Sequence, residues 1–255
     1  MNSEIVCMPP SREAGFSLLE MAMVMLIVGL LLGGLLSALG DTAETSRRSE
    51  IEADLEMIQE ALYGFAQANG RLPCPATITS AGQEDPVGGG ACTAWHGFVP
   101  MLALGIQGTV NDQGLIMDPW GTPIRYSVSS HTMPSTARAF TSTAGMSEVF
   151  AAGSLAPGVN LICVSTTTAC DATVLGNPVP AVIFSVGANA RFHTSAIEIE
   201  NINSNVAPPN WGTVANNNFV SAPYAEDGTL EFDDTILWLS TNILFSRLVA
   251  AGQLP

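Results

Sequence analysis

The sequence predicts an α+β protein in which one long N-terminal helix packs on a β-rich C-terminal head. Three observations support this class. A long apolar run near the N-terminus continues as an amphipathic helical pattern, short apolar runs separated by turn residues follow Gly70, and a second helical pattern lies near the C-terminus. The chain has 255 residues, 47% of them hydrophobic, which is enough for a long helix and a globular domain.

The charge balance is strongly acidic. The chain has 23 acidic and 8 basic side chains, a formal net charge of −15, and every basic residue is Arg. Affinity for nucleic acid comes mostly from clustered cations that displace counterions. We therefore expect no nucleic-acid partner.

Residues 16–39 form a run of 24 residues in which only Glu20 can be charged. As a helix this run spans roughly 36 Å, which is enough to cross a hydrocarbon core of about 30 Å. A cleaved secretory signal would carry its cleavage site after the apolar core. Here the candidate cleavage site precedes the run, so the sequence predicts a membrane-spanning helix that is retained.

Residues 40–70 continue the helix in amphipathic form. Its apolar residues recur at steps of three and four, at Ile51, Leu55, Ile58, Leu62 and Phe65, and the other face carries Glu50, Glu52, Glu56 and Glu60. Asn69 and Gly70 end the pattern, and Pro73 prevents its continuation. We expect the apolar face of this half to pack on the head.

The predicted head, residues 71–255, is rich in turn-forming residues. Apolar runs at 124–128, 159–164 and 181–186 predict strands. A last helical pattern extends from about Asp234 to Ala250 and stops at Gly252, and Asp233 or Asp234 would be its N-cap.

The chain has five cysteines, which the apolar run separates into one before it and four after it. Cys7 precedes the apolar run, and Cys74, Cys92, Cys163 and Cys170 follow it in two close pairs. An even number beyond a membrane segment favours an oxidising compartment, although four unpaired buried thiols are the alternative. Of the three possible connectivities we expect Cys74 with Cys92 and Cys163 with Cys170, because each closes a short local loop.

The stretch from Glu13 to Glu20, EAGFSLLE, resembles the processing motif of type IV prepilins and pseudopilins. In that family a hydrophilic leader ends in Gly, the mature chain begins with an apolar residue, and Glu is its fifth residue. The resemblance implies that 1–15 is a leader removed between Gly15 and Phe16. It also implies that Glu20 pairs with the Phe16 amine of a neighbouring subunit. Alternatively, Glu20 lies at the cytoplasmic interface.

Two elements of the head are also similar to that family. The DPWG element within 117–126 resembles a turn and strand of the major pseudopilin of type II secretion, in which Trp120 would cover the long helix. Ser185, Gly187 and their neighbours resemble a strand-turn element of the same heads. Together these resemblances imply a pilin-like fold.

An acidic run follows Tyr224 and precedes the last helical pattern. Dense carboxylates suit a cation with oxygen ligands, and the major pseudopilin family has a C-terminal calcium loop. The resemblance implies calcium ligands at Asp227, Glu231, Asp233 and Asp234. The alternative is a solvated loop in which one Asp caps the helix.

No GxSxG, HExxH or P-loop motif is present, and His96, His131 and His193 have no spacing that suggests a metal site or a triad. We expect no enzymatic activity and, apart from calcium, no cofactor. The resemblance implies a structural subunit of a type II secretion pseudopilus or a type IV pilus. Its partners would be prepilin peptidase, an inner-membrane assembly platform and other subunits.

The location that follows is the bacterial inner membrane, crossed once with the head in the periplasm, and then a periplasmic or extracellular filament. The alternative hypothesis assigns the chain to a different functional class, a membrane-anchored exported domain that binds a ligand or catalyses a reaction. The N-terminus of the mature chain distinguishes the two hypotheses, because only the first requires a chain that begins at Phe16.

Overall fold

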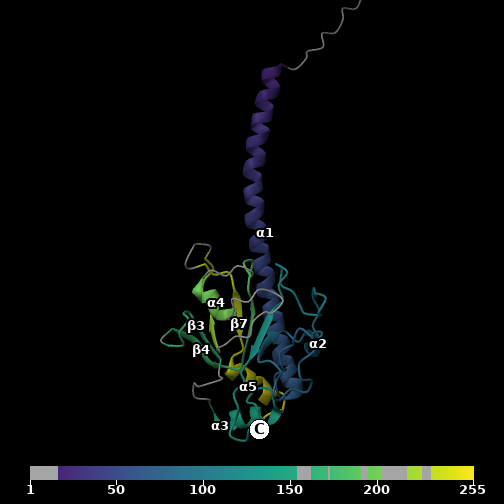
Figure 1. The fold of residues 1–255 in the computed structure, drawn as a ribbon, viewed down its shortest axis with the longest axis vertical. Helices are drawn as coiled ribbons and strands as arrows, with labels where there is room; N and C mark the ends of the chain where they lie inside the picture. The colour runs from purple at the N-terminus through teal and green to yellow at the C-terminus, as the bar shows by residue number, and fades with distance from the viewer. Residues whose placement is uncertain (1–16, 154–161, 172, 191–194, 203–216, 226–230) are drawn as a thin grey trace, which may run out of the picture. The chain divides into compact units, whose positions relative to one another are not determined.

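The computed structural model describes residues 17–153, 162–171, 173–190, 195–202, 217–225 and 231–255, without the side chains of 32–42 (Figure 1). The predicted leader, 1–15, lies outside this part. In chain order the elements are α1 (Leu18–Asn69), β1 (His96–Phe98), α2 (Met101–Leu104), β2 (Arg125–Val128), α3 (Thr143–Ala152), β3 (Ile162–Ser165), β4 (Val174–Val179), β5 (Ala181–Ser185), α4 (Ala196–Ile202), β6 (Asn218–Val220), β7 (Thr235–Trp238) and α5 (Thr241–Ala250). The architecture is α+β, with an N-terminal helix and a β-sheet head.

Helix α1 has 52 residues, from Leu18 to Asn69, and it is continuous across the boundary between the two predicted halves, 16–39 and 40–70. It ends at Asn69, and the next residue, Gly70, has a φ of 67°, which lies in the left-handed region that glycine adopts without strain. The chain divides into two compact units, Met1–Ser46 and Arg47–Pro255, and the division falls within α1.

In the first unit, the apolar side chains from Leu18 to Leu31 are exposed. Among the residues that the structure describes, no helix is both long enough and apolar enough to cross a membrane. The predicted membrane-spanning segment, 16–39, includes residue 16 and the side chains of 32–39, which lie outside the described part.

In the second unit, the C-terminal half of α1 packs one face into the core. Of the predicted apolar positions, four are fully buried, at Ile51, Leu55, Ile58 and Leu62, and Phe65 is partly buried. The glutamates at 50, 52, 56 and 60 are exposed. The periodicity therefore correctly predicted which face of this half is covered by the head.

The head contains two sheets. An antiparallel sheet has the strand order β1-β2-β5-β7, and a smaller sheet has the order β4-β3-β6. Alternate side chains of β5 enter different cores, because successive residues of a strand point to opposite faces. Ala181 and Ile183 join the core that contains α1, and Val182 and Phe184 join the core that contains the small sheet. The four-stranded sheet thus lies between α1 and the small sheet.

The predicted helix from Asp234 to Ala250 is wrong in its first part. Residues 235–238 form strand β7, which pairs with β5, and α5 begins only at Thr241, with Ser240 as its N-cap residue. Ile236 faces the small-sheet core, whereas Leu237 packs against the core of α1. This alternation is that of a strand, although the apolar positions also fit a helix.

Candidate functional site

The described part of the chain begins just after the predicted processing site. Gly15 and Phe16 are outside the described residues. Ser17 precedes the helix, and its hydroxyl and carbonyl oxygens accept the backbone N–H of Glu20 at 3.2 and 3.1 Å. The Glu20 side chain is exposed in the first turn, among exposed apolar side chains. A helix segment that is apolar on all sides requires an apolar environment to cover it.

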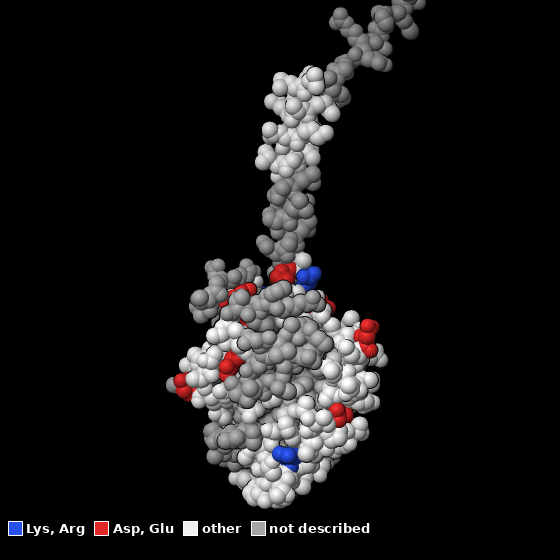
Figure 2. All heavy atoms as spheres, viewed as in Figure 1, with Lys and Arg blue, Asp and Glu red and all other residues white. Residues whose placement is uncertain are grey.

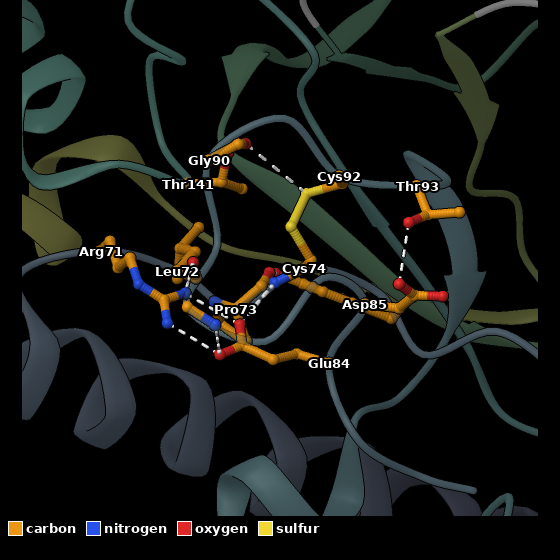
Figure 3. The surroundings of a disulfide bond; sticks show 12 residues. Arg71, Leu72, Pro73, Cys74, Glu84, Asp85, Gly90, Cys92, Thr93 and Thr141 are labelled. Carbon is orange, nitrogen blue, oxygen red and sulfur yellow. Dashed lines mark hydrogen bonds and ion pairs between the residues drawn. A yellow bond between two sulfur atoms is a disulfide. The ribbon is translucent and has the colours of Figure 1, made fainter. Parts of the chain in front are cut away.

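The structure joins the two cysteine pairs that the sequence analysis chose. Cys74 is bonded to Cys92 and Cys163 to Cys170, with Cα–Cα distances of 5.4 and 6.2 Å. Figure 3 shows the first bond beside the segment that follows α1. Chain-entropy estimates assign roughly 2.5–3 kcal/mol to loops of these lengths. Each bond therefore stabilises a segment that has little regular secondary structure.

A buried ion pair lies next to the first disulfide (Figure 3). The Arg71 guanidinium donates to both carboxylate oxygens of Glu84 at 2.7 and 2.8 Å. Glu84 also accepts the backbone N–H groups of Cys74 and Gly88. Burial raises the pKa of Glu84, but these hydrogen bonds and the Arg71 charge outweigh it and leave the pKa below its ordinary value. No local sequence pattern identifies this pair.

The two head elements that carry the family resemblance contact each other. Ser185 donates to the Asp118 carboxylate at 2.6 Å, and that carboxylate also accepts the N–H groups of Trp120 and Thr122. Trp120 is partly buried against the core that includes α1. The DPWG turn and the end of β5 are therefore held together by one buried carboxylate.

A cluster of three carboxylates, Glu198, Asp233 and Asp234, lies near the end of β5 and the start of β7. Each offers a ligand atom within 4.8 Å of the other two, and all three are buried. Glu198 comes from α4 and accepts the backbone N–H of Asp233 at 3.0 Å. Asp233 also accepts the N–H groups of Ala188 and Asn189. We call these three residues the carboxylate cluster.

Two oxygen atoms of the carboxylate cluster have no hydrogen-bond partner among the described residues. Asp234 accepts from the Asn201 amide at 2.7 Å through Oδ2. The Oδ1 atoms of Asp233 and Asp234 are buried, and no described residue donates a hydrogen bond to them. Burial and the Glu198 charge raise the pKa of Asp233 to about 6 and that of Asp234 well above its ordinary value. Buried carboxylate oxygens without partners are costly, and a bound cation would reduce this cost.

The predicted calcium ligands are only partly brought together. Asp233 and Asp234 are in the carboxylate cluster, Glu231 is described but is not one of its members, and Asp227 lies outside the described residues. Glu198 belongs to the cluster, but it is not among the ligands that the sequence predicted. It lies 35 residues before Asp233, and no local pattern connects the two.

No histidine belongs to the metal-ligand group found among the described residues. His96 is partly buried in β1, where burial and the Arg125 charge lower its pKa to about 4. His193 lies outside the described part of the chain. That the histidines hold no metal stays a prediction.

Residues 10–36 match the family described as the prokaryotic N-terminal methylation motif. No curated protein and no solved structure matched the chain. The matched range contains Gly15, Phe16 and Glu20, the three residues that carry the resemblance in the sequence. The N-terminus of this chain thus carries the methylation motif that is characteristic of type IV pilins and pseudopilins.

Proposed function

We propose that this chain is a structural subunit of a type IV pilus or of a type II secretion pseudopilus. The observation that carries the proposal is the methylation motif at residues 10–36. The exposed apolar side chains at the start of α1 and the oxidised cysteines of the head are consistent with it. The subunit would be held in the inner membrane by residues 16–39, with its head in the periplasm, and would then enter a filament.

Each part of the motif has a physical role in this proposal. Prepilin peptidase would cut after Gly15, where an extended backbone without a side chain fits a peptidase. The new amine of Phe16 would carry a positive charge both before and after its methylation. Glu20, one turn further along α1, would supply the opposite charge to the amine of a neighbouring subunit. Such pairing matters because an isolated carboxylate in an apolar environment costs about 2.5–3.5 kcal/mol.

Replacing Gly15 by Leu should leave the precursor uncut, whereas the wild-type chain should lose its leader and begin at Phe16. A side chain at position 15 would intrude where the peptidase holds the backbone. Intact-mass analysis of membrane fractions, in a host that has the peptidase, distinguishes the precursor from the mature chain of 240 residues.

The matched control is Ser11→Leu, which places the same side chain in the leader but away from the cleavage site. It should be processed like the wild type. A wild-type chain that still carries residues 1–15 in this host would contradict the filament proposal. It would favour the alternative of an anchored domain.

We also propose that the head binds calcium at the carboxylate cluster. Its oxygen donors suit a hard cation, and the partnerless oxygens of Asp233 and Asp234 support such a ligand. Glu198, Asp233 and Asp234 would hold the ion. The ion would neutralise buried negative charge and connect α4 to the strand β7.

Calcium should raise the thermal midpoint of the head, and a chelator should lower it. At about one hundred times the dissociation constant, binding adds about 2.7 kcal/mol, which corresponds to roughly 5–10 °C. Asp234→Asn should abolish this response. In chelator the same variant should be at least as stable as the wild type, because one repelling charge is gone and the bond to Asn201 can persist.

Glu231→Gln is the matched control, since it removes a carboxylate of the acidic run that lies outside the carboxylate cluster. It should keep the calcium response. Equal thermal midpoints of the wild type in calcium and in chelator would overturn the calcium proposal and leave the filament proposal unaffected.

A further inference from the structure

A groove of about 580 Å³ lies between the C-terminal half of α1 and residues 107–121. Glu50, Asp54 and Met57 line it from the helix, and Val110 and Asn111 are among the residues that line it from the other segment. All of these residues belong to the second compact unit. The groove contains no residue of the methylation motif or of the carboxylate cluster.

The groove is negatively charged. Glu50 and Asp54 are four residues apart, so they lie on the same face of α1. Partial burial and the Glu50 charge raise the pKa of Asp54 above its ordinary value. None of the described residues that line the groove is Arg, Lys or His. On the face drawn in Figure 2, in contrast, acidic side chains mostly lie apart, separated by uncharged residues.

The third carboxylate of the groove, Asp118, is already used by the fold. It accepts hydrogen bonds from the N–H groups of Trp120 and Thr122 and from the hydroxyls of Thr122 and Ser185. Glu50 and Asp54 are therefore the carboxylates that remain to meet a partner from outside. They favour a cation, and Arg or Lys is the cation that a protein partner supplies.

Apolar side chains lie beside the two carboxylates. Met57 and Val110 line the groove and are 41% and 46% exposed. An unbranched Met side chain adapts to different partners. The groove therefore combines two carboxylates with apolar surface, which suits a cationic side chain that has an apolar neighbour.

A second copy of this chain fits the groove poorly. The chain has a net charge of −15 and no Lys, so a second copy offers few cations to an acidic groove. Of the six arginines that the structure describes, Arg71 and Arg247 are paired with Glu84 and Glu60, and Arg125 is buried. Arg47 and Arg48 also make interactions of their own. Arg138 donates to the Ser130 carbonyl and the Thr132 hydroxyl. The cation should therefore come from a different and more basic protein.

We propose that the groove between α1 and residues 107–121 binds a segment of a different protein in which an Arg or Lys stands next to an apolar residue. Glu50 and Asp54 receive the cation, and Met57 and Val110 contact its apolar neighbour. This interaction does not depend on filament assembly.

The test measures the binding of labelled nine-residue peptides to the full chain in non-ionic detergent by fluorescence anisotropy. One peptide has alternating Leu and Arg, and the other has citrulline in place of each Arg, which keeps the shape and removes the charge. We expect the Arg peptide to bind at least about tenfold more tightly. Equal affinities would overturn the proposal.

Two double variants with the same change in charge locate the binding site. Glu50→Gln with Asp54→Asn should abolish the preference for Arg, whereas Glu52→Gln with Glu56→Gln, on the same helix but outside the groove, should keep it. An equal loss in both would show non-specific attraction and overturn the proposal. Self-association in sedimentation that only the first double variant removes would assign the groove to a second copy, and would equally overturn it.

Discussion

Replacing Glu84 by Gln is expected to lower the free energy of unfolding of the head by about 3–5 kcal/mol. The substitution leaves the Arg71 guanidinium buried without its counter-charge, because the two side chains are only 11% and 6% exposed. It also weakens the acceptor of the Cys74 and Gly88 N–H groups. Urea unfolding of the oxidised protein, followed by circular dichroism, measures the change.

The matched control is Glu60→Gln, which breaks the ion pair of Glu60 with Arg247 at 2.6 Å. Its side chains are 35% and 60% exposed, so water replaces the lost contact. We expect a cost below about 1 kcal/mol. Equal costs for the two variants would mean that the Arg71 pair is not shielded from water.

The contribution of Glu84 to the stability of the head should depend on pH. Its pKa in the folded state is below the ordinary value of about 4.5, so its carboxylate stabilises the fold fully above that value. This stabilisation is lost as the pH falls through the lower, folded pKa. The difference in stability between the wild type and Glu84→Gln should therefore be constant near neutral pH and shrink in acid. Urea midpoints measured from pH 7 to pH 3 test this prediction.

Replacing Glu20 by Ala should reduce incorporation into filaments by about tenfold or more, while the membrane level and the protease resistance of the head stay unchanged. Under the proposed function, the Phe16 amine of a neighbouring subunit would then lack its counter-charge in an apolar environment. Glu20 is exposed in the first turn of α1, so its removal breaks no contact within the head. The measurement is the ratio of subunit in purified filaments to subunit in membranes.

Glu52→Ala removes the same kind of charge from an exposed position further along α1, and it should leave this ratio unchanged. Normal incorporation of Glu20→Ala beside wild-type partners would contradict pairing with a following subunit. It would be consistent with a subunit at the tip of a filament, where no neighbour ahead needs the carboxylate.

The features that could be predicted from the sequence are those whose cause is local. The stripe from Ile51 to Leu62 repeats with the period of a helix, and α1 buries that stripe. The apolar runs at 124–128 and 181–186 became β2 and β5, since both are bounded by turn residues. Cysteine pairs that close short loops need no knowledge of distant segments, and the structure contains both of them.

Residues 234–250 show where local patterns are ambiguous. The apolar positions there fit one helix, but residues 235–238 pair with β5 and alternate between two cores. A strand requires a partner strand, and here the partner lies about fifty residues earlier in the chain. Asp233 and Asp234 consequently do not cap a helix and instead join Glu198.

The carboxylate cluster and the Arg71 pair depend on contacts between segments that no periodicity connects. Glu198 reaches Asp233 only because α4 packs beside the start of β7, and Glu84 reaches Arg71 only because the loop that contains it folds back toward the end of α1. A repeat within one segment shows which of its faces is apolar. It does not show which distant residue will cover a charge, because burial and pairing of charges arise when segments pack together.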